Sequence, residues 1–252
     1  MRYQLLILAF LIFPSLMIAP HVAYERPQDD SEKPLYYTTG NEATIVGTVS
    51  VTGTIPSPQR IDMSPDPVCT TITEGKAETE SFIVNENKLK NGFVYLKGGP
   101  LLNYQFAKPT TERQLKHSHC RYSPHVMGLQ VGQSLRISNS DETVHNTHPT
   151  PRVNQEWNYS QVSGHEFVKT FTRPEVLIPF KCNQHPWEKA YVGVLKHPYF
   201  AVSNGSGRFE IPNVPPGTYK LVVWHETLGE LEQELTLVAG ETRSVDFTFK
   251  SP

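Results

Sequence analysis

The sequence predicts an all-β protein, and three observations support this. Apolar residues occur in short runs, such as residues 93–96 and 176–180, which have the length of strands. The 252 residues include 21 prolines and 16 glycines, which lie between the runs, where turns are expected. The sequence shows no long amphipathic helix pattern, internal repeat or low-complexity tract. Its hydrophobic content of 38% is that of a globular protein, and its length allows one or two domains.

The first residues have the pattern of an export signal. Arg2 supplies a positive charge, and residues 5–19 are mostly apolar. This run is too short for a typical transmembrane helix, and an uncleaved membrane anchor is the alternative. We therefore expect a signal peptide at residues 1–23, a polar linker at residues 24–42, and a periplasmic or secreted location.

Strand-like segments begin near residue 43. Residues 129–137, for example, alternate between apolar and polar on either side of Gly132, as two half-buried strands do. From residue 197 the pattern changes to closely spaced strands between Gly and Pro turns. We therefore expect one domain at residues 43–196 and a second at 197–252. The predicted strands are residues 45–51, 82–84, 93–96, 129–131, 135–137, 167–171, 176–180, 190–194, 209–211, 219–224, 231–238 and 244–249.

The cysteine count is odd. An oxidising compartment favours pairing two of the three cysteines and leaving one for another role. Because Cys182 lies in a loop that resembles a metal site, the predicted disulfide joins Cys69 and Cys120. Three free buried thiols are the alternative.

One short stretch carries the clearest chemistry. Cys182 and His185 lie on a tight loop between two strand-like runs, and a thiolate and an imidazole together suit copper or zinc. His145 also follows a strand-like run and is the best candidate for a third ligand. Glu188 adds a carboxylate three residues after His185. We therefore predict one metal ion bound by His145, Cys182, His185 and Glu188.

The His145-Asn146 pair followed by the Cys-x-x-His loop resembles the blue-copper, or cupredoxin, family, in particular the short C-x-x-H-x-x-M form of amicyanin. The resemblance covers residues 43–196 and implies a Greek-key β-sandwich that binds one copper ion. In that family the Asn after the first His hydrogen-bonds across to the cysteine loop, which supports the ligands.

Glu188 stands where that family has Met. A carboxylate oxygen at this position would favour Cu(II) over Cu(I) and lower the reduction potential. The alternative is that Glu188 faces solvent and the site has three ligands. Zinc, which accepts the same donors, is the competing metal.

Residues 207–221 follow the pattern G-x-F-x-I-x-x-V-P-P-G-x-Y-x-L, which resembles the carboxypeptidase regulatory-like, transthyretin-like β-sandwich family. The resemblance implies a small β-sandwich without catalytic residues. Residues 197–252 are few for a self-sufficient core, so we expect them to pack on the first domain or to borrow the early strand at residues 47–51. The combination of both parts resembles exported proteins described as methylamine-utilisation-like.

These features predict an electron-transfer protein rather than an enzyme. Its partner would be a redox protein, with His185 as the edge where electrons leave, and Trp187 would form either an apolar docking rim or part of the core. The net charge of −2 and the lack of a basic stripe argue against nucleic-acid binding. Membrane contact is expected only through an uncleaved signal. The alternatives are a copper-delivery protein with a labile site and a surface interaction protein with a vestigial copper loop.

The other histidines carry weaker signals. His148, three residues after His145, is expected in a solvated loop, with contact to the site as the alternative. His125 is expected to pack at the domain edge and His225 to lie at the surface or between domains, and His117 and His119 flank Cys120.

Overall fold

The computed structural model describes residues 32–251. The predicted signal peptide at residues 1–23, and residues 24–31 of the expected linker, lie outside this range. Lys33–Pro252 form one compact unit. Among the described residues, no helix is both long enough and apolar enough to cross a membrane.

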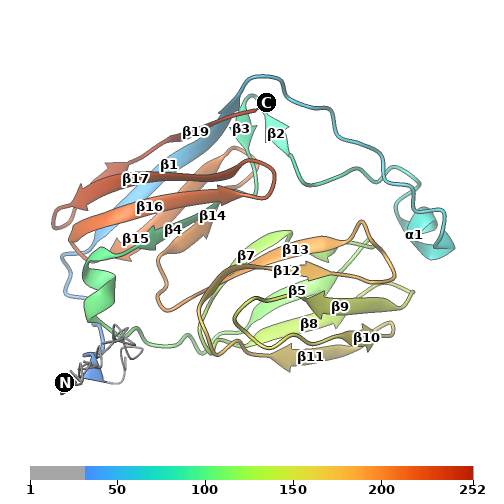
Figure 1. Cartoon of the computed structure of the whole chain (residues 1–252), viewed down its shortest axis with the longest axis horizontal. Coiled ribbons are helices and arrows are strands. Elements are labelled where there is room, and N and C mark those ends of the chain that lie inside the picture. The colour runs from blue at the N-terminus through green and yellow to red at the C-terminus, as the bar shows by residue number, and fades with distance from the viewer. Residues whose placement is uncertain (1–31, 252) are drawn as a thin grey trace, which may run out of the picture. The chain divides into compact units, whose positions relative to one another are not determined.

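The fold class is all-β, as predicted (Figure 1). The described chain contains one α-helix of six residues, α1, and one 3-10 helix, η2, besides its strands. The elements in chain order are β1(Ala43–Thr52), α1(Pro67–Ile72), β2(Val84–Asn85), β3(Lys88–Leu89), β4(Phe93–Lys97), η2(Gly99–Asn103), β5(Arg113–His117), β6(Tyr122–Ser123), β7(Val126–Gln130), β8(Leu135–Asn139), β9(His145–Pro149), β10(Tyr159–Gln161), β11(Glu166–Lys169), β12(Glu175–Lys181), β13(Lys189–Leu195), β14(Phe200–Val202), β15(Arg208–Val214), β16(Gly217–His225), β17(Gly229–Leu237), β18(Thr242–Ser244) and β19(Phe247–Lys250).

A first β-sandwich uses strands β5 to β13. One sheet has the order β10-β9-β12-β13-β7 and the other β11-β8-β5-β6. Apolar side chains from both sheets form a shared buried core, because alternate residues of each strand point inward. Its members are Leu115, Tyr122, Met127, Leu129, Leu135, Ile137, Phe171, Ile178, Phe180, Ala190, Val192 and Val194. In this sandwich β9 and β12 are neighbours, which brings the ends of two predicted ligand segments together.

A second β-sandwich combines the early and the late strands. β1 pairs with β15, β18 and β19, and β4 lies between β14 and β16. The expectation that residues 47–51 pair with the C-terminal strands is thus confirmed. The sheets do not follow the boundary expected at residue 197, because the C-terminal strands need β1 and β4 to complete two sheets around a core.

Aromatic side chains join the two sandwiches. Phe93 and Phe200 pack with buried residues from both sandwiches. Gly193 and Gly128 provide the space: a Cβ at Gly193 would lie 2.4 Å from the Phe93 ring, and one at Gly128 would lie 2.2 Å from the Phe200 ring. Glycine at these two positions therefore allows the rings to lie directly against the backbone of β13 and β7.

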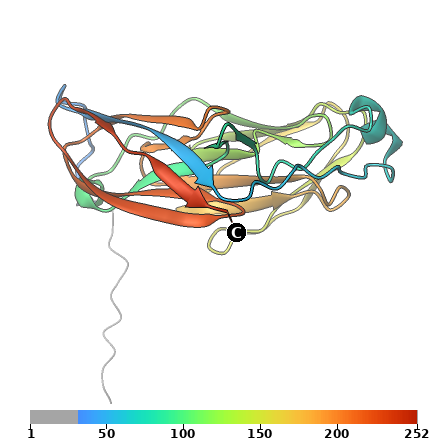
Figure 2. The ribbon, with the colours of Figure 1, turned by 90° about the horizontal axis from the view of Figure 1, so that it is seen from above.

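The connection between β1 and β2 covers one end of the first sandwich (Figure 2). It contains α1, whose N-cap is Asp66: the Asp66 carboxylate accepts hydrogen bonds from the backbone N–H groups of Val68 and Cys69. Cys69 forms a disulfide with Cys120, and Cys182 remains a free thiol. The predicted pairing is present, and the alternative of three free thiols is wrong.

Candidate metal centre

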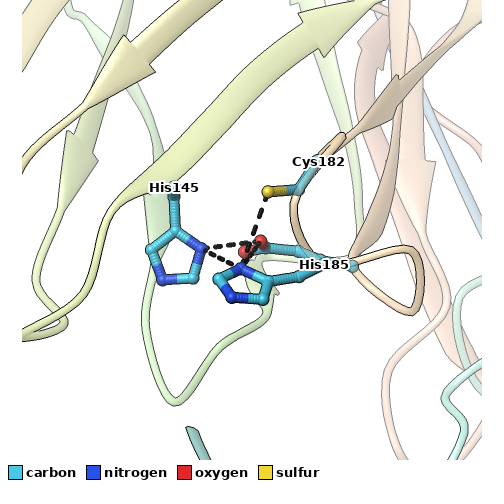
Figure 3. A group of neighbouring side chains, drawn as sticks. His145, Cys182 and His185 are labelled. Carbon is cyan, nitrogen blue, oxygen red and sulfur yellow. Dashed lines mark hydrogen bonds and ion pairs between the residues drawn. The ribbon is translucent and has the colours of Figure 1, made fainter. Parts of the chain in front are cut away.

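The four predicted ligands come from neighbouring strand ends. His145 is the first residue of β9, Cys182 follows β12 directly, and His185 and Glu188 lie in the loop before β13. This loop is tight because the Cys182 N–H donates to the Glu188 carbonyl and the Glu188 N–H donates to the His185 carbonyl, at 3.3 and 2.9 Å. The loop therefore places three of the four side chains beside the start of β9 (Figure 3).

One donor atom from each residue points to a common space. The two imidazole Nδ1 atoms are 3.0 Å apart, and the Cys182 Sγ lies 3.7 Å from the His185 Nδ1. The Glu188 Oε2 lies 2.9 Å from the His145 Nδ1 and 3.9 Å from the His185 Nδ1. All these atoms lie within 4.8 Å of one another.

This donor set fits a copper or zinc ion. Donors bound at 2.0–2.3 Å to one ion are roughly 3–4 Å apart, which is close to the separations found here. The four residues are between 0% and 3% exposed, so Glu188 does not face solvent. Its carboxylate is one of the four converging groups, and the alternative of a solvent-facing Glu188 is wrong.

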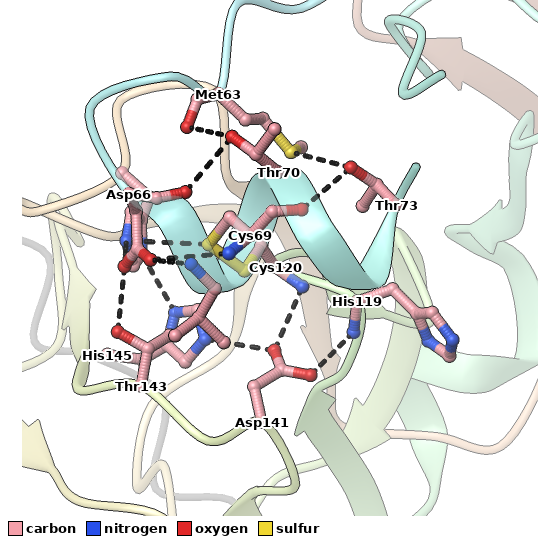
Figure 4. Close-up of a disulfide and its surroundings, with 12 residues drawn as sticks. Met63, Asp66, Cys69, Thr70, Thr73, His119, Cys120, Asp141, Thr143 and His145 are labelled. Atoms are coloured by element: carbon pink, nitrogen blue, oxygen red, sulfur yellow. Dashed lines mark hydrogen bonds and ion pairs between the residues drawn. A yellow bond between two sulfur atoms is a disulfide. The ribbon is translucent and has the colours of Figure 1, made fainter. Parts of the chain in front are cut away.

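Two carboxylates orient the imidazoles from behind (Figure 4). The Asp141 Oδ2 lies 2.9 Å from the His145 Nε2, and the Asp66 Oδ2 lies 3.0 Å from the His185 Nε2. Such pairs hold a proton on Nε2 and direct Nδ1 towards the metal position. Asp141 is itself held by the backbone N–H groups of His119 and Cys120.

The expectation that His185 presents an exposed edge is wrong. Its side chain is buried, with its Nε2 facing Asp66 and lying 3.7 Å from the Cys69 Sγ. The physical reason is the α1 segment, which the disulfide with Cys120 holds over this imidazole. No local pattern in the sequence predicts that residues 66–69 cover the loop, because Asp66 and Cys69 lie 119 and 116 residues away from His185.

Asn146 ties the two ligand segments together, as the family resemblance implied. Its backbone N–H donates to the Cys182 Sγ at 3.2 Å, and its side-chain Oδ1 accepts from the Asn183 N–H at 3.2 Å. The thiolate thus receives a hydrogen bond from a fixed backbone group, which limits both its position and its basicity.

His117 is a functional residue that sequence reasoning missed. Its Nδ1 lies 2.6 Å from the Glu188 Oε1, its Nε2 lies 2.8 Å from the Thr147 Oγ1, and its ring stacks on His145 with centroids 4.5 Å apart. Each Glu188 oxygen therefore contacts one histidine. One sequence pattern could have indicated His117. In residues 113–117 side chains point alternately inward and outward, so His117 lies on the same inward face as Leu115.

The electrostatics of the site suit a metal ion. Burial alone would lower the pKa of His145, but hydrogen bonds with Asp141, Cys182 and Glu188 raise that pKa to about 11. Burial would raise the pKa of Glu188, but its hydrogen bonds with His117 and His145 lower it to about 2. Burial opposes ionisation of Cys182, but contacts with His145 and His185 lower the pKa of the thiol.

These directions describe a charge-balanced cluster in which the anionic donors are already ionised. A metal ion would replace the protons on the two imidazole Nδ1 atoms, so binding would release protons and weaken as the pH falls.

Comparisons with known proteins found one family model and several solved structures. A family model for the carboxypeptidase regulatory-like domain matches residues 183–250. Among solved structures, the chain is similar to a copper-containing nitrite reductase from Thermus scotoductus SA-01, with 18% identity over 39% of this chain and 27% of that chain and a TM-score of 0.32. The chain therefore spans about a quarter of the reductase.

A cupredoxin and an amicyanin variant are also similar. A purple cupredoxin from Nitrosopumilus maritimus is 21% identical over 32% of this chain and 98% of that chain, with a TM-score of 0.29. A reduced amicyanin variant is 19% identical over 34% of this chain and 84% of that chain, with a TM-score of 0.31. No curated protein matches the chain. The expected likeness to methylamine-utilisation proteins finds no support in these comparisons.

Removing His117 tests whether it holds Glu188 in place. In His117→Phe one oxygen of a buried carboxylate loses its partner, so the free energy of unfolding of the metal-free protein should fall by about 3 kcal/mol. Urea unfolding in the presence of a chelator measures this. His117→Phe/Glu188→Gln, which also neutralises the carboxylate, should regain part of the loss. Equal stability of His117→Phe and the original protein would contradict the role of His117.

Proposed function

We propose that this chain is an exported mononuclear copper protein that acts in electron transfer. The observation that supports this most is the convergence of two imidazole nitrogens, one thiolate and one carboxylate oxygen in a single buried space. Two histidines and a cysteine are the donors that suit copper in electron-transfer sites, with the fourth donor setting the potential. A bound copper ion would supply a one-electron couple between Cu(II) and Cu(I).

The residues around the donors favour repeated electron transfer. Asp141, Asp66 and the Asn146 N–H each hold one of the three ligands His145, His185 and Cys182 through a hydrogen bond. Because these contacts restrain the donors, little rearrangement would accompany a change of oxidation state. Burial also keeps bulk water away from the donors, which limits exchange and side reactions.

Glu188 distinguishes this site from one with a thioether as the fourth donor. Its carboxylate carries a negative charge next to the metal position and is held on both oxygens by His117 and His145. A fixed anionic oxygen favours the more highly charged Cu(II), so we expect a lower reduction potential than a methionine would give.

Two other roles remain to be distinguished from electron transfer. A delivery protein needs ligands that exchange readily, whereas here Asp66 and the disulfide-linked α1 enclose His185. The enclosure therefore favours a metal that stays bound. A structural zinc site is the second candidate, because two imidazoles, one thiolate and one carboxylate also suit tetrahedral zinc.

Copper titration of the metal-free protein separates copper from zinc. One Cu(II) per chain should produce an intense visible charge-transfer band from the Cys182 thiolate, and Cys182→Ser should abolish the band. His145→Ala and His185→Ala should weaken binding and change the spectrum. Absorption spectroscopy and metal analysis measure both effects. A protein that stays colourless with copper and takes up only zinc would overturn the proposal.

Replacing Glu188 by Met tests its place at the metal. A soft thioether prefers Cu(I), so the reduction potential should rise, and each 59 mV corresponds to about a tenfold change in the one-electron equilibrium. Voltammetry measures the shift. Glu188→Met also removes the partner of His117. The same change is therefore compared in a second background, His117→Phe against His117→Phe/Glu188→Met, where that contact is missing from both proteins. A potential and spectrum that do not change in either comparison would remove Glu188 from the ligand set.

Asp66 and the disulfide should slow the loss of copper. Asp66→Asn keeps a cap for α1 but weakens the charge-assisted bond to His185, and Cys69→Ala/Cys120→Ala frees the α1 segment. Both should release Cu(I) faster to a soluble chelator, with the double variant faster than Asp66→Asn. Asp62→Asn, an exposed change in the same segment, is the control. Equal release rates in all four proteins would show that the segment does not retain the metal.

A further inference from the structure

We propose that electrons enter and leave the copper centre through the indole ring of Trp187. This inference rests on the proposed electron-transfer function and names the side chain that connects the buried site to a redox partner. Two observations support it. The His185 imidazole contacts the Trp187 indole, and other protein groups, Asp66 among them, cover the rest of that imidazole.

The imidazole of His185 has no exposed edge of its own. Its Nδ1 points to the other donors, and its Nε2 is occupied by the Asp66 carboxylate at 3.0 Å. The Cys69 Sγ lies on the same side, 3.7 Å from Nε2. A partner protein therefore cannot contact this ring directly, and electrons that pass through His185 need a further group.

Trp187 is placed to be that group. Its ring centroid lies 5.1 Å from the His185 ring, with 34° between the planes. Its Nε1–H donates to the Cys120 carbonyl at 3.1 Å, and the ring packs against the cluster formed by Met63, Cys69, Ala77 and Cys120. The indole is therefore fixed in orientation on both its apolar and its polar side.

Trp187 also reaches the surface. Its side chain is half-buried and lines a pocket of about 130 Å³ together with Ser81, Arg121, the exposed Lys189 and the candidate ligand Glu188, which is itself only 1% exposed. Electronic coupling falls steeply with distance, so an aromatic ring that contacts a ligand and also lines a surface pocket shortens the gap to a partner. The pocket marks where a small redox reagent could approach.

A rival path would leave through the cysteine side of the loop. Asn183, directly after Cys182, is exposed, and its Oδ1 lies 3.0 Å from the Nδ1 of His148. The His148 side chain is 12% exposed and contacts Glu156. This face offers an imidazole near the surface, but its ring touches Asn183 rather than a candidate ligand, so the link to the metal runs through the backbone.

The experiment compares electron-transfer rates of copper-loaded proteins. Stopped-flow absorption follows the return of the Cu(II) band when the Cu(I) protein is oxidised by hexacyanoferrate(III), which accepts one electron and becomes hexacyanoferrate(II). The variants are Trp187→Leu, which removes the ring, Trp187→Phe, which keeps a ring but not the N–H, and His148→Leu on the rival face. The spectrum and reduction potential of each protein are measured first.

The proposal expects Trp187→Leu to react roughly tenfold more slowly than the original protein, a change of about 1.4 kcal/mol in activation free energy. Trp187→Phe should keep most of the rate, and His148→Leu should keep all of it. An unchanged rate in Trp187→Leu with an unchanged spectrum and potential would overturn the proposal. So would a slow His148→Leu beside a normal Trp187→Leu.

A second variant covers the case in which Trp187→Leu loses its copper. Ser81→Leu leaves Trp187 in place and puts an aliphatic side chain into the pocket that both residues line, so it should slow the reaction with hexacyanoferrate(III) while the spectrum stays the same. A normal rate for Ser81→Leu would then overturn the proposal. Failure of the proposed function gives a different result, because the original protein would itself bind no copper or show no one-electron couple.

Discussion

A fully buried carboxylate has to be paired, and the pairing of Glu188 constrains the whole metal centre. Removing a charge from water costs several kcal/mol unless partners replace the lost hydration. Glu188 meets this need with one imidazole on each oxygen, His117 from β5 and His145 from β9. The two sheets of the first sandwich are therefore connected by charge as well as by their apolar core. The metal position lies beside this bridge, so its geometry depends on the same pairing.

Further hydrogen-bonded pairs extend from Glu188 towards the surface, and the carboxylates in them are less buried than Glu188. The imidazoles that face the metal position are backed by Asp141 and Asp66, and both carboxylates end on backbone N–H groups. Asp66 also caps α1, so a helix terminus and a metal ligand share one side chain. A change in the segment before β2 would therefore affect the metal position, although none of the four predicted ligands lies in that segment. The disulfide restrains this connection and keeps the outermost carboxylate in place.

The sequence predicts the four converging residues because their signal is local. Cys182, His185 and Glu188 share one loop, and a strand-end histidine completes a pattern with a chemical meaning. Asp66 and His117 carry no such signal, because their role depends on which distant segments meet. The pairing of Cys69 with Cys120 could be predicted from the count of cysteines, but the position of that disulfide over His185 could not.

The same distinction applies to the fold. Alternating apolar residues predict most of the strands, and turn residues separate them, because both patterns depend on neighbours in sequence. The partners of a strand are not encoded locally. The change of pattern at residue 197 is a real change in strand spacing, yet β4 precedes it and lies between β14 and β16, which follow it.

Strands β1 and β4 pair with strands that come after β5 to β13 in the chain. This pairing also determines which part of a newly made chain can fold first. Val49 in β1 pairs with Phe247 in β19, so β1 cannot complete its sheet until residue 247 has been synthesised. The segment from β5 to β13 is continuous in sequence and contains all four converging residues, so this part can assemble while the last strands are still missing. Until then β1 lacks its partners β18 and β19, and an unpaired strand edge is open to pairing with other chains.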